Sequence, residues 1–513
     1  MWQAALLILA LLQAPQVAEQ AKFEARAKDW RMGAIVYQVF VDRFAPSQNL
    51  DAKKKVIVSP RKLKEWSETP TPSKYDPKIG YPHVLEFWGG DLKSVQSKLD
   101  YIDSVGADVL YLTPIFKSYS NHKYDTEDYK AIAPEFGTRR DLLDLIADVH
   151  KRRKRIMLDG VFNHIGKTSP IFQEAQRGGK SRYRDWFTFG KEFPSGYRGW
   201  YGGADMPALR LENPAVRDYL WNAPDSVLRS YLRDGIDGWR LDVAYDIGPR
   251  YLAEATKAAH ETKAGSAVIG EISGYPANWF GAVDGVFNFH SMQVVINMLN
   301  TDISGGRAGQ MLARVTQDAG IENLLRSWLQ IDNHDTPRAA DTIADRSLRR
   351  LAQALLFTLP GSPVIYYGSE LGMHGAGDPQ NRAPMRWDLA NDKNPDLTWV
   401  RQLTRLRKKY PALRYGDFQA LDTDSLLAFT RMTDKMGETV LVVVNPNNET
   451  TRETFATRVG RILSWGDMED VLMGEKLPSK TGLLSVSMPA RSVRLFVPSL
   501  KSFSGYSPFL RIP

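Results

Sequence analysis

Short apolar runs alternate with longer amphipathic segments over most of the chain, which indicates strands alternating with helices. The predicted strands cover residues 35–41, 109–114, 155–159, 238–243, 267–271, 284–287, 327–332 and 363–368. Segments between them, such as 139–154 and 347–358, have the apolar period of a helix. Strands that alternate with helices in this way predict an α/β fold, a parallel (β/α)8 TIM barrel with its helices on the outside.

Two further patterns divide the chain into domains. Residues 164–209, after the third predicted strand, are rich in glycine, aromatic and charged residues, and predict a small inserted subdomain. After about residue 415 the runs 426–431, 439–444, 484–488 and 492–497 alternate with turn residues, which predicts a C-terminal antiparallel β-sandwich. We therefore expect the barrel to comprise 22–163 and 210–414, the insertion 164–209, the sandwich 415–499 and a loosely held tail 500–513.

The first residues form an apolar run, 4–12, that is too short to span a bilayer comfortably and is followed by small and polar residues. This predicts a secretory signal peptide over residues 1–21 and export to the periplasm or the medium. The alternatives are an uncleaved anchor or a buried first helix. The rest of the chain predicts no stable membrane anchor.

The composition of the chain limits the classes of partner that it can bind. The 67 basic and 59 acidic residues give a formal charge of +8, and the basic runs are scattered, so we expect solvated faces and no nucleic-acid partner. The chain contains no cysteine, which excludes disulfides, thiol catalysis and thiolate metal sites. The aromatic content of 11% is worth noting, because sugar rings bind by stacking on flat apolar faces.

Polar residues gather at the ends of the predicted strands. In a β/α barrel these positions face the mouth where substrates bind. The cluster members are Asp159, Asn163, His164, Arg240, Asp242, Glu271, Asn333, His334 and Asp335. Arg240 and Asp242 are two residues apart on one strand and therefore share a face. A structural Arg–Asp pair is the alternative for these two, but so many converging polar groups favour an active site.

Asp242 and Glu271 lie on consecutive predicted strands, as expected for the two carboxylates of a retaining glycosidase. The charge of Arg240 should keep Asp242 ionised as a nucleophile. Acidic neighbours should raise the pKa of Glu271, so that it holds a proton for the leaving oxygen. Asp335 would then be a third carboxylate, contacting sugar hydroxyls in the transition state.

The same residues carry a family resemblance. Segments 159–164 (DGVFNH), 238–242 (GWRLD), 270–271 (GE) and 333–335 (NHD) resemble, in order, the signature regions of the α-amylase family. The resemblance implies a nucleophile at Asp242, an acid/base at Glu271 and a transition-state stabiliser at Asp335. It also implies that His164, Arg240 and His334 contact the sugar at the cleavage subsite.

Other segments resemble the cyclomaltodextrinase, neopullulanase and maltogenic amylase group of that family. These are 122–126 (HKYDT), 206–209 (MPAL) and 377–382 (GDPQNR). The match implies that Tyr124 stacks on a sugar ring while His122, Asp378 and Arg382 hold hydroxyl groups. The alternatives are a packed barrel aromatic for Tyr124 and a loop-stabilising ion pair for Asp378 and Arg382. Members of the group often dimerise through an N-terminal domain, whereas the barrel pattern here begins at residue 33, so we expect a monomer or a homodimer.

The resemblance also implies a Ca²⁺ site, with oxygen ligands from Asn49, Asp51, Gly89 and Asp91. The alternative is a turn with a helix N-cap at Asp91. No organic cofactor is expected.

The predicted activity is endo-type, retaining hydrolysis of α-1,4-glucosidic bonds in maltodextrins, cyclodextrins or related α-glucans. A glucanotransferase would use the same site, with a sugar as acceptor in place of water. A non-catalytic amylase-fold binding protein is the third possibility, but such proteins are expected to lack some catalytic carboxylates, and this chain has all three.

Overall fold

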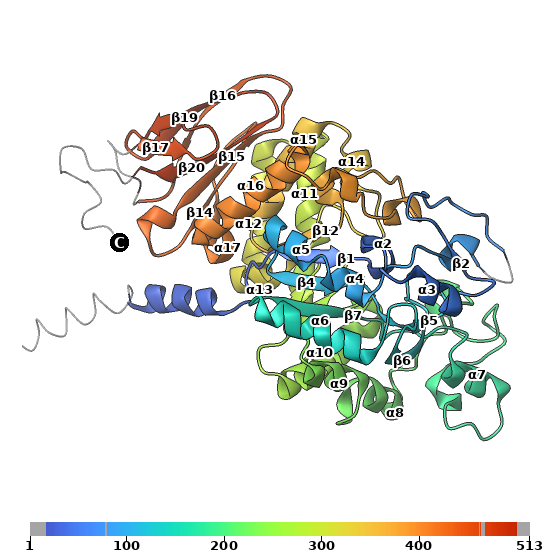
Figure 1. Cartoon of the computed structure of the whole chain (residues 1–513). Helices are drawn as coiled ribbons and strands as arrows, with labels where there is room; N and C mark the ends of the chain where they lie inside the picture. Colours follow the sequence, from blue (N-terminus) through green and yellow to red (C-terminus); the bar gives the residue numbers. More distant parts are fainter. Residues whose placement is uncertain (1–16, 77–79, 461, 463–466, 500–513) are drawn as a thin grey trace, which may run out of the picture.

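A closed sheet of parallel strands forms the centre of the molecule (Figure 1). The structure is a computed structural model that describes residues 17–76, 80–460, 462 and 467–499. The strands follow the order β10–β9–β8–β7–β4–β1–β12–β11, and a parallel bridge between Phe287 and Trp328 joins the two ends. Their bounds are β1 Val36–Val39, β4 Val109–Leu112, β7 Arg155–Gly160, β8 Gly238–Leu241, β9 Ala267–Gly270, β10 Gly285–Val286, β11 Trp328–Leu329 and β12 Ser362–Tyr366. The predicted (β/α)8 barrel is confirmed.

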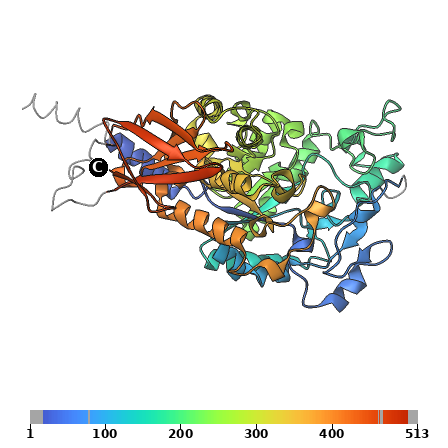
Figure 2. The same ribbon diagram turned by 90° about the horizontal axis from the view of Figure 1, so that it is seen from above.

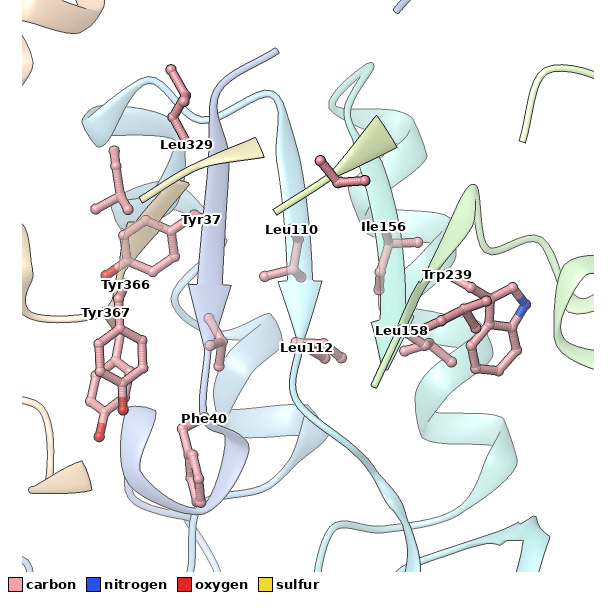
Figure 3. Close-up of a cluster of buried hydrophobic side chains, with 14 of the residues drawn as sticks. Tyr37, Phe40, Leu110, Leu112, Ile156, Leu158, Trp239, Leu329, Tyr366 and Tyr367 are labelled. Atoms are coloured by element: carbon pink, nitrogen blue, oxygen red, sulfur yellow. The ribbon is translucent and has the colours of Figure 1, made fainter. Parts of the chain in front are cut away.

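The strands are buried on both faces, which explains why they read as continuous apolar runs. Side chains such as Val36, Val109 and Ile269 form a cluster inside the barrel. The alternate residues point outward toward the helices, as Figure 3 shows for Leu110, Ile156, Leu158 and Trp239. Gly238 is needed on β8 because a Cβ there would lie 2.3 Å from the carbonyl oxygen of Ala267 on the neighbouring strand.

Helices cover the outside of the barrel and return the chain to the start of the next strand. They are α5 Leu99–Val105, α6 Arg139–Lys151, α9 Val227–Asp234, α10 Ala244–Thr262, α11 Phe289–Leu299, α12 Gly305–Ala319, α13 Ile321–Arg326, α15 Arg346–Thr358 and α16 Pro395–Lys409. Local sequence sets their ends: Thr138 and Asp141 form a capping box on α6, and Gly106 ends α5 in the left-handed conformation. Between β9 and β10 only a 3₁₀ turn, η5 Pro276–Trp279, is present.

The segment inserted after β7 folds back on its own beginning. An antiparallel bridge joins His164 to Ala208, and the amide of Leu209 donates to the carbonyl of Asn163. The insertion contains one helix of more than one turn, α7 Pro170–Arg177, and a small aromatic core around Phe172. Its two ends therefore meet at the carboxyl end of β7, where the predicted active site lies.

The C-terminal strands form two antiparallel sheets, visible in red and orange in Figure 2. The larger sheet has the order β13–β14–β15–β20–β17–β18, and the smaller pairs β16 with β19. Their bounds are β13 Asp417–Ala420, β14 Leu427–Met432, β15 Val440–Asn445, β16 Thr451–Ala456, β17 Asp467–Asp470, β18 Lys476–Pro478, β19 Leu483–Met488 and β20 Ser492–Pro498. Leu441 and Val443 from the larger sheet share a buried cluster with Leu484 and Val486 from the smaller one, which confirms the predicted sandwich.

The described chain begins with a helix over residues 17–28. This helix is tied to the main body through Phe23, which is buried, and through Lys22 and Arg26, which pair with Asp417. Most of the predicted signal peptide lies outside the described residues. Every helix in the described ranges is too short or too polar to span a bilayer.

Candidate active site

A buried arginine lies at the centre of the barrel mouth. Arg240 on β8 is in register with Asp159 on β7, so both side chains point into the barrel. Its guanidinium is 2.8 Å from Asp159 Oδ1, 2.8 Å from Asp242 Oδ1 and 2.9 Å from Glu271 Oε1. One cation thus contacts the carboxylates of three neighbouring strands, and Asp242 and Glu271 both bind to it.

The backbone beyond β8 and β9 keeps these carboxylates in place. The amide of Glu271 donates to the carbonyl of Leu241, which continues the ladder past the end of the strand. The amide of Val243 donates to Glu271 Oε2 at 2.9 Å. Val243 has φ 39° and ψ 47°, a left-handed conformation that is costly for a β-branched residue. Such strain persists where surrounding contacts over-determine it, as happens at functional sites.

The electrostatics of Asp242 differ from the expectation made above. Burial raises the pKa of Asp242, the charge of Arg240 lowers it, and the nearby Glu271 and Asp159 raise it again. The net direction is upward, because Asp242 is buried and one guanidinium is shared among three carboxylates. The expectation that Arg240 would dominate was therefore wrong. Charge alone does not decide which carboxylate is the nucleophile.

Asp335 approaches from the opposite side of the mouth. It follows β11, and its carboxylate is 3.3 Å from Arg382 Nη2 and 3.1 Å from His334 Nε2. Arg382 also contacts Asp378 at 3.1 Å and donates to the backbone carbonyl of His334. Burial raises the pKa of Asp378, but the interaction with His83 and the charge of Arg382 lower it to about 2. Asp335 is nearly half exposed, so it is open to a ligand in the mouth.

An aromatic side chain links the two sides. The hydroxyl of Tyr124 donates to Asp159 at 2.9 Å and lies 2.5 Å from His334 Nε2. The ring of His122 lies next to that of Tyr124, with centroids 5.9 Å apart. Burial lowers the pKa of His122 to about 3, so this ring is neutral at neutral pH. The predicted substrate residues of segments 122–126 and 377–382 thus lie beside the Arg240 cluster.

His164 forms the contact between the barrel and the inserted segment. Its ring stacks on Trp200, with centroids 5.2 Å apart. Trp200 in turn donates from Nε1 to Asp246, near the start of α10. Trp200, Tyr201 and Asp246 line a cavity of about 290 Å³ beside these residues. Burial lowers the pKa of His164 to about 4, so it is also neutral near pH 7.

The predicted calcium ligands do not fit a bound calcium ion in the arrangement seen here. The side chain of Asn49 accepts from the amide of Ala52 and caps α3, Leu50–Val56. Asp51 is exposed and pairs with Lys54. Asp91 caps α4, Leu92–Gln96, as the alternative reading expected, and its other oxygen lies 2.6 Å from the ammonium of Lys53. Three of the four predicted ligands thus use their side-chain oxygens elsewhere. In the described parts of the chain, no cluster of three or more acidic or histidine side chains forms another metal site.

Sequence reasoning overlooked two residues of this site. Tyr111 on β4 donates to Asp159 at 2.6 Å, and Gln38 on β1 lies 2.9 Å from His334 Nδ1. Both are polar residues within apolar strands, and this was the only feature of the sequence that could have marked them as site residues. It is weak, because their partners are 48 and 296 residues away along the chain.

Comparison with known proteins agrees with the geometry. Residues 38–416 match the family model "Alpha amylase, catalytic domain". This chain belongs to the α-amylase family. It is 33% identical to a cyclomaltodextrinase from Geobacillus thermopakistaniensis over 90% of this chain and 76% of the relative. It is also 33% identical to neopullulanase 2 from Thermoactinomyces vulgaris, over 90% of this chain and 77% of the relative.

Among solved structures, one similar chain is a cyclic α-maltosyl-(1→6)-maltose hydrolase from Arthrobacter globiformis in complex with cyclic α-maltosyl-(1→6)-maltose. The identity is 27%, the TM-score is 0.76, and the match covers 91% of this chain and 99% of that one. The protein is therefore an enzyme, a glycoside hydrolase of the α-amylase family similar to cyclomaltodextrinases and neopullulanases.

Proposed function

We propose that this α-amylase-family enzyme hydrolyses α-1,4-glucosidic bonds within maltodextrins, cyclodextrins or related α-glucans and retains the anomeric configuration. The observation that carries the proposal is the contact of one guanidinium, that of Arg240, with both Asp242 and Glu271. Two carboxyl groups that contact the same guanidinium are near neighbours, and a short separation favours the retaining mechanism over the inverting one. The cyclomaltodextrinase and neopullulanase relatives support the choice of substrate class.

In the first step, an oxygen of Asp242 attacks the anomeric carbon and forms a glycosyl ester. Glu271 gives its proton to the glycosidic oxygen, which leaves with the bonding electron pair. In the second step, the Glu271 carboxylate takes a proton from water, and the water oxygen attacks the anomeric carbon. The ester bond breaks, the sugar is released as the α-anomer, and Asp242 regains its carboxylate. Arg240 is buried behind these groups and holds both in position.

The remaining residues position the sugar. Asp335 is exposed enough to accept hydrogen bonds from sugar hydroxyls that strengthen in the transition state. Tyr124 supplies a stacking surface, and His122, His164 and His334 are suited to contact hydroxyl groups as neutral rings. Asp378 and Arg382 form one ion pair at the rim, where charged groups can hold the end of a sugar chain.

The test is incubation of the purified enzyme with β-cyclodextrin, pullulan, soluble starch and maltotriose, followed by product chromatography and proton NMR of early products. The proposal expects cleavage of α-1,4 bonds with the α-anomer appearing first. An initial β-anomer would exclude the two-step mechanism. Products longer than the substrate would show that a sugar competes with water at the glycosyl ester, which is the transferase alternative.

We also propose that the enzyme is exported, because residues 4–12 form a signal-like apolar run. Intact-mass analysis of protein from the native host should show loss of about the first 17–21 residues. A soluble cytoplasmic pool that keeps Met1 would refute export. Sedimentation of the same sample would distinguish the monomer from the homodimer.

A further inference from the structure

The loop between β1 and β4 contains a buried lysine. Lys53 is the buried residue of α3, and its ammonium lies 2.6 Å from Asp91 Oδ2 and 2.7 Å from the backbone carbonyl oxygen of Glu135. The lysine stem passes over the turn at Gly89, where a Cβ would lie 3.7 Å from Lys53 Cγ. A lysine is rarely buried unless its charge is paired, so these contacts explain its place.

The oxygen atoms that contact the Lys53 ammonium are of the types that bind hard cations. A carboxylate oxygen and a backbone carbonyl oxygen are the ligand types preferred by Ca²⁺. The ammonium of lysine is a compact point charge with three donors, and it can satisfy the same oxygens without a metal. A second cation close to Lys53 would be repelled, and Asp51 is turned toward solvent. The carboxylate of Asp91, one of the predicted ligands, is thus already paired with a cation of this protein.

This position is connected to the sugar-binding residues. Lys53 donates a hydrogen bond to the backbone carbonyl of Glu135. The carboxylate of Glu135 in turn pairs with the fully buried ammonium of Lys123. Lys123 is adjacent in sequence to Tyr124, whose hydroxyl contacts Asp159. Two buried lysines therefore anchor both the first β/α loop and the segment that carries His122 and Tyr124.

We propose that the ammonium of Lys53 is a built-in replacement for a calcium ion, so that the loop between β1 and β4 holds its structure without metal. We expect calcium to leave the stability of the wild-type protein unchanged, and loss of the ammonium to create a position where calcium can bind. This expectation does not depend on the proposed substrate, because it is tested by thermal stability.

The decisive variant is Lys53→Asn, which removes the ammonium and offers an amide oxygen beside Asp91. The matched control is Lys54→Asn, the next residue, whose exposed ammonium pairs with Asp51. The melting temperature of each protein is measured in excess EDTA and in millimolar CaCl₂, with MgCl₂ as an ionic-strength control. For wild type, and likewise for Lys54→Asn, the melting temperature should not differ among the three solutions. Lys53→Asn should melt at a lower temperature in EDTA and recover part of the loss in CaCl₂.

Two results would overturn the proposal. One is a rise in the wild-type melting temperature with calcium, or stoichiometric calcium in the purified wild-type protein by elemental analysis. The other is a Lys53→Asn protein that folds but melts at the same temperature in EDTA and CaCl₂. If Lys53→Asn does not fold, calorimetric titration of wild type with CaCl₂ decides instead: absence of binding supports the replacement, and one-to-one binding refutes it.

Discussion

The rings of Tyr124 and His334 lie parallel, at an interplanar angle of 1°, with centroids 5.2 Å apart. The Tyr124 hydroxyl is only 2.5 Å from His334 Nε2, so the two planes can be no more than 2.5 Å apart. Carbon atoms in contact need about 3.5 Å, so the rings lie side by side rather than face to face. His334 is almost fully buried, and the Tyr124 ring keeps only a small exposed surface, 9% of the residue, on which a sugar ring could stack.

This surface predicts different effects for two variants of Tyr124. Tyr124→Phe keeps the ring but loses the hydrogen bonds to Asp159 and His334, and should lower kcat/KM on the order of 10-fold. Tyr124→Ala also loses the platform and should lower kcat/KM by roughly 100-fold, mainly through a higher KM. Equal effects of the two variants would show that the ring face does not bind the sugar.

The two carboxylates under Arg240 should separate in their response to the leaving group. Asp242→Asn should lose about 10⁴-fold or more of kcat on every substrate, because an amide cannot form the glycosyl ester. Glu271→Gln should lose roughly 10²–10⁴-fold on glucans, where the leaving oxygen needs a proton. On α-maltosyl fluoride, whose leaving group needs no protonation, the first step of Glu271→Gln should be much less impaired. Rescue of Asp242→Asn by that substrate would reverse the assignments.

Removal of the charge of Arg240 should move the acidic limb of the kcat/KM profile to higher pH. The guanidinium favours the ionised form of Asp242 and so lowers its pKa against the effect of burial. In Arg240→Met that opposing charge is gone, the pKa of Asp242 rises, and the ionised nucleophile forms only at higher pH. Arg240→Lys keeps the charge and is the control, with folding checked by circular dichroism. An unchanged acidic limb in a folded Arg240→Met would mean that the limb reports another group.

The N-terminal helix should contribute measurably to stability. Arg26 is buried and pairs with Asp417 at 2.7 Å and with Glu322 at 2.5 Å. Arg26→Ala should lower the free energy of unfolding by about 1–3 kcal/mol, because charge-assisted hydrogen bonds are lost. Lys28→Ala, an exposed position on the same helix, should be neutral in urea titration. If both variants are as stable as wild type, the helix is not needed by the folded enzyme.

Much of this molecule follows from local pattern. Apolar strands bounded by polar residues were recognisable one at a time, because burial on both faces of a parallel sheet demands such runs. The shared face of Arg240 and Asp242 follows from the two-residue period of a strand. Apolar strands also alternate with turn residues in the C-terminal region, which made those strands predictable. These are short-range constraints, and they made the barrel, the sandwich and the positions of the polar clusters predictable.

Contacts between distant segments were decided only by the fold. Tyr111 and Gln38 join the site because closure of the barrel brings them next to Asp159 and His334, and no local period encodes that proximity. The pKa of Asp242 depends on its burial in the closed barrel and on the sharing of Arg240 with two other carboxylates. Neighbours in sequence do not reveal either of these. Lys53 lies in a run of three lysines that reads as a solvated face, yet α3 turns that one ammonium inward to Asp91. Burial and charge pairing are properties of the packed chain, so they could be settled only after its segments had been brought together in space.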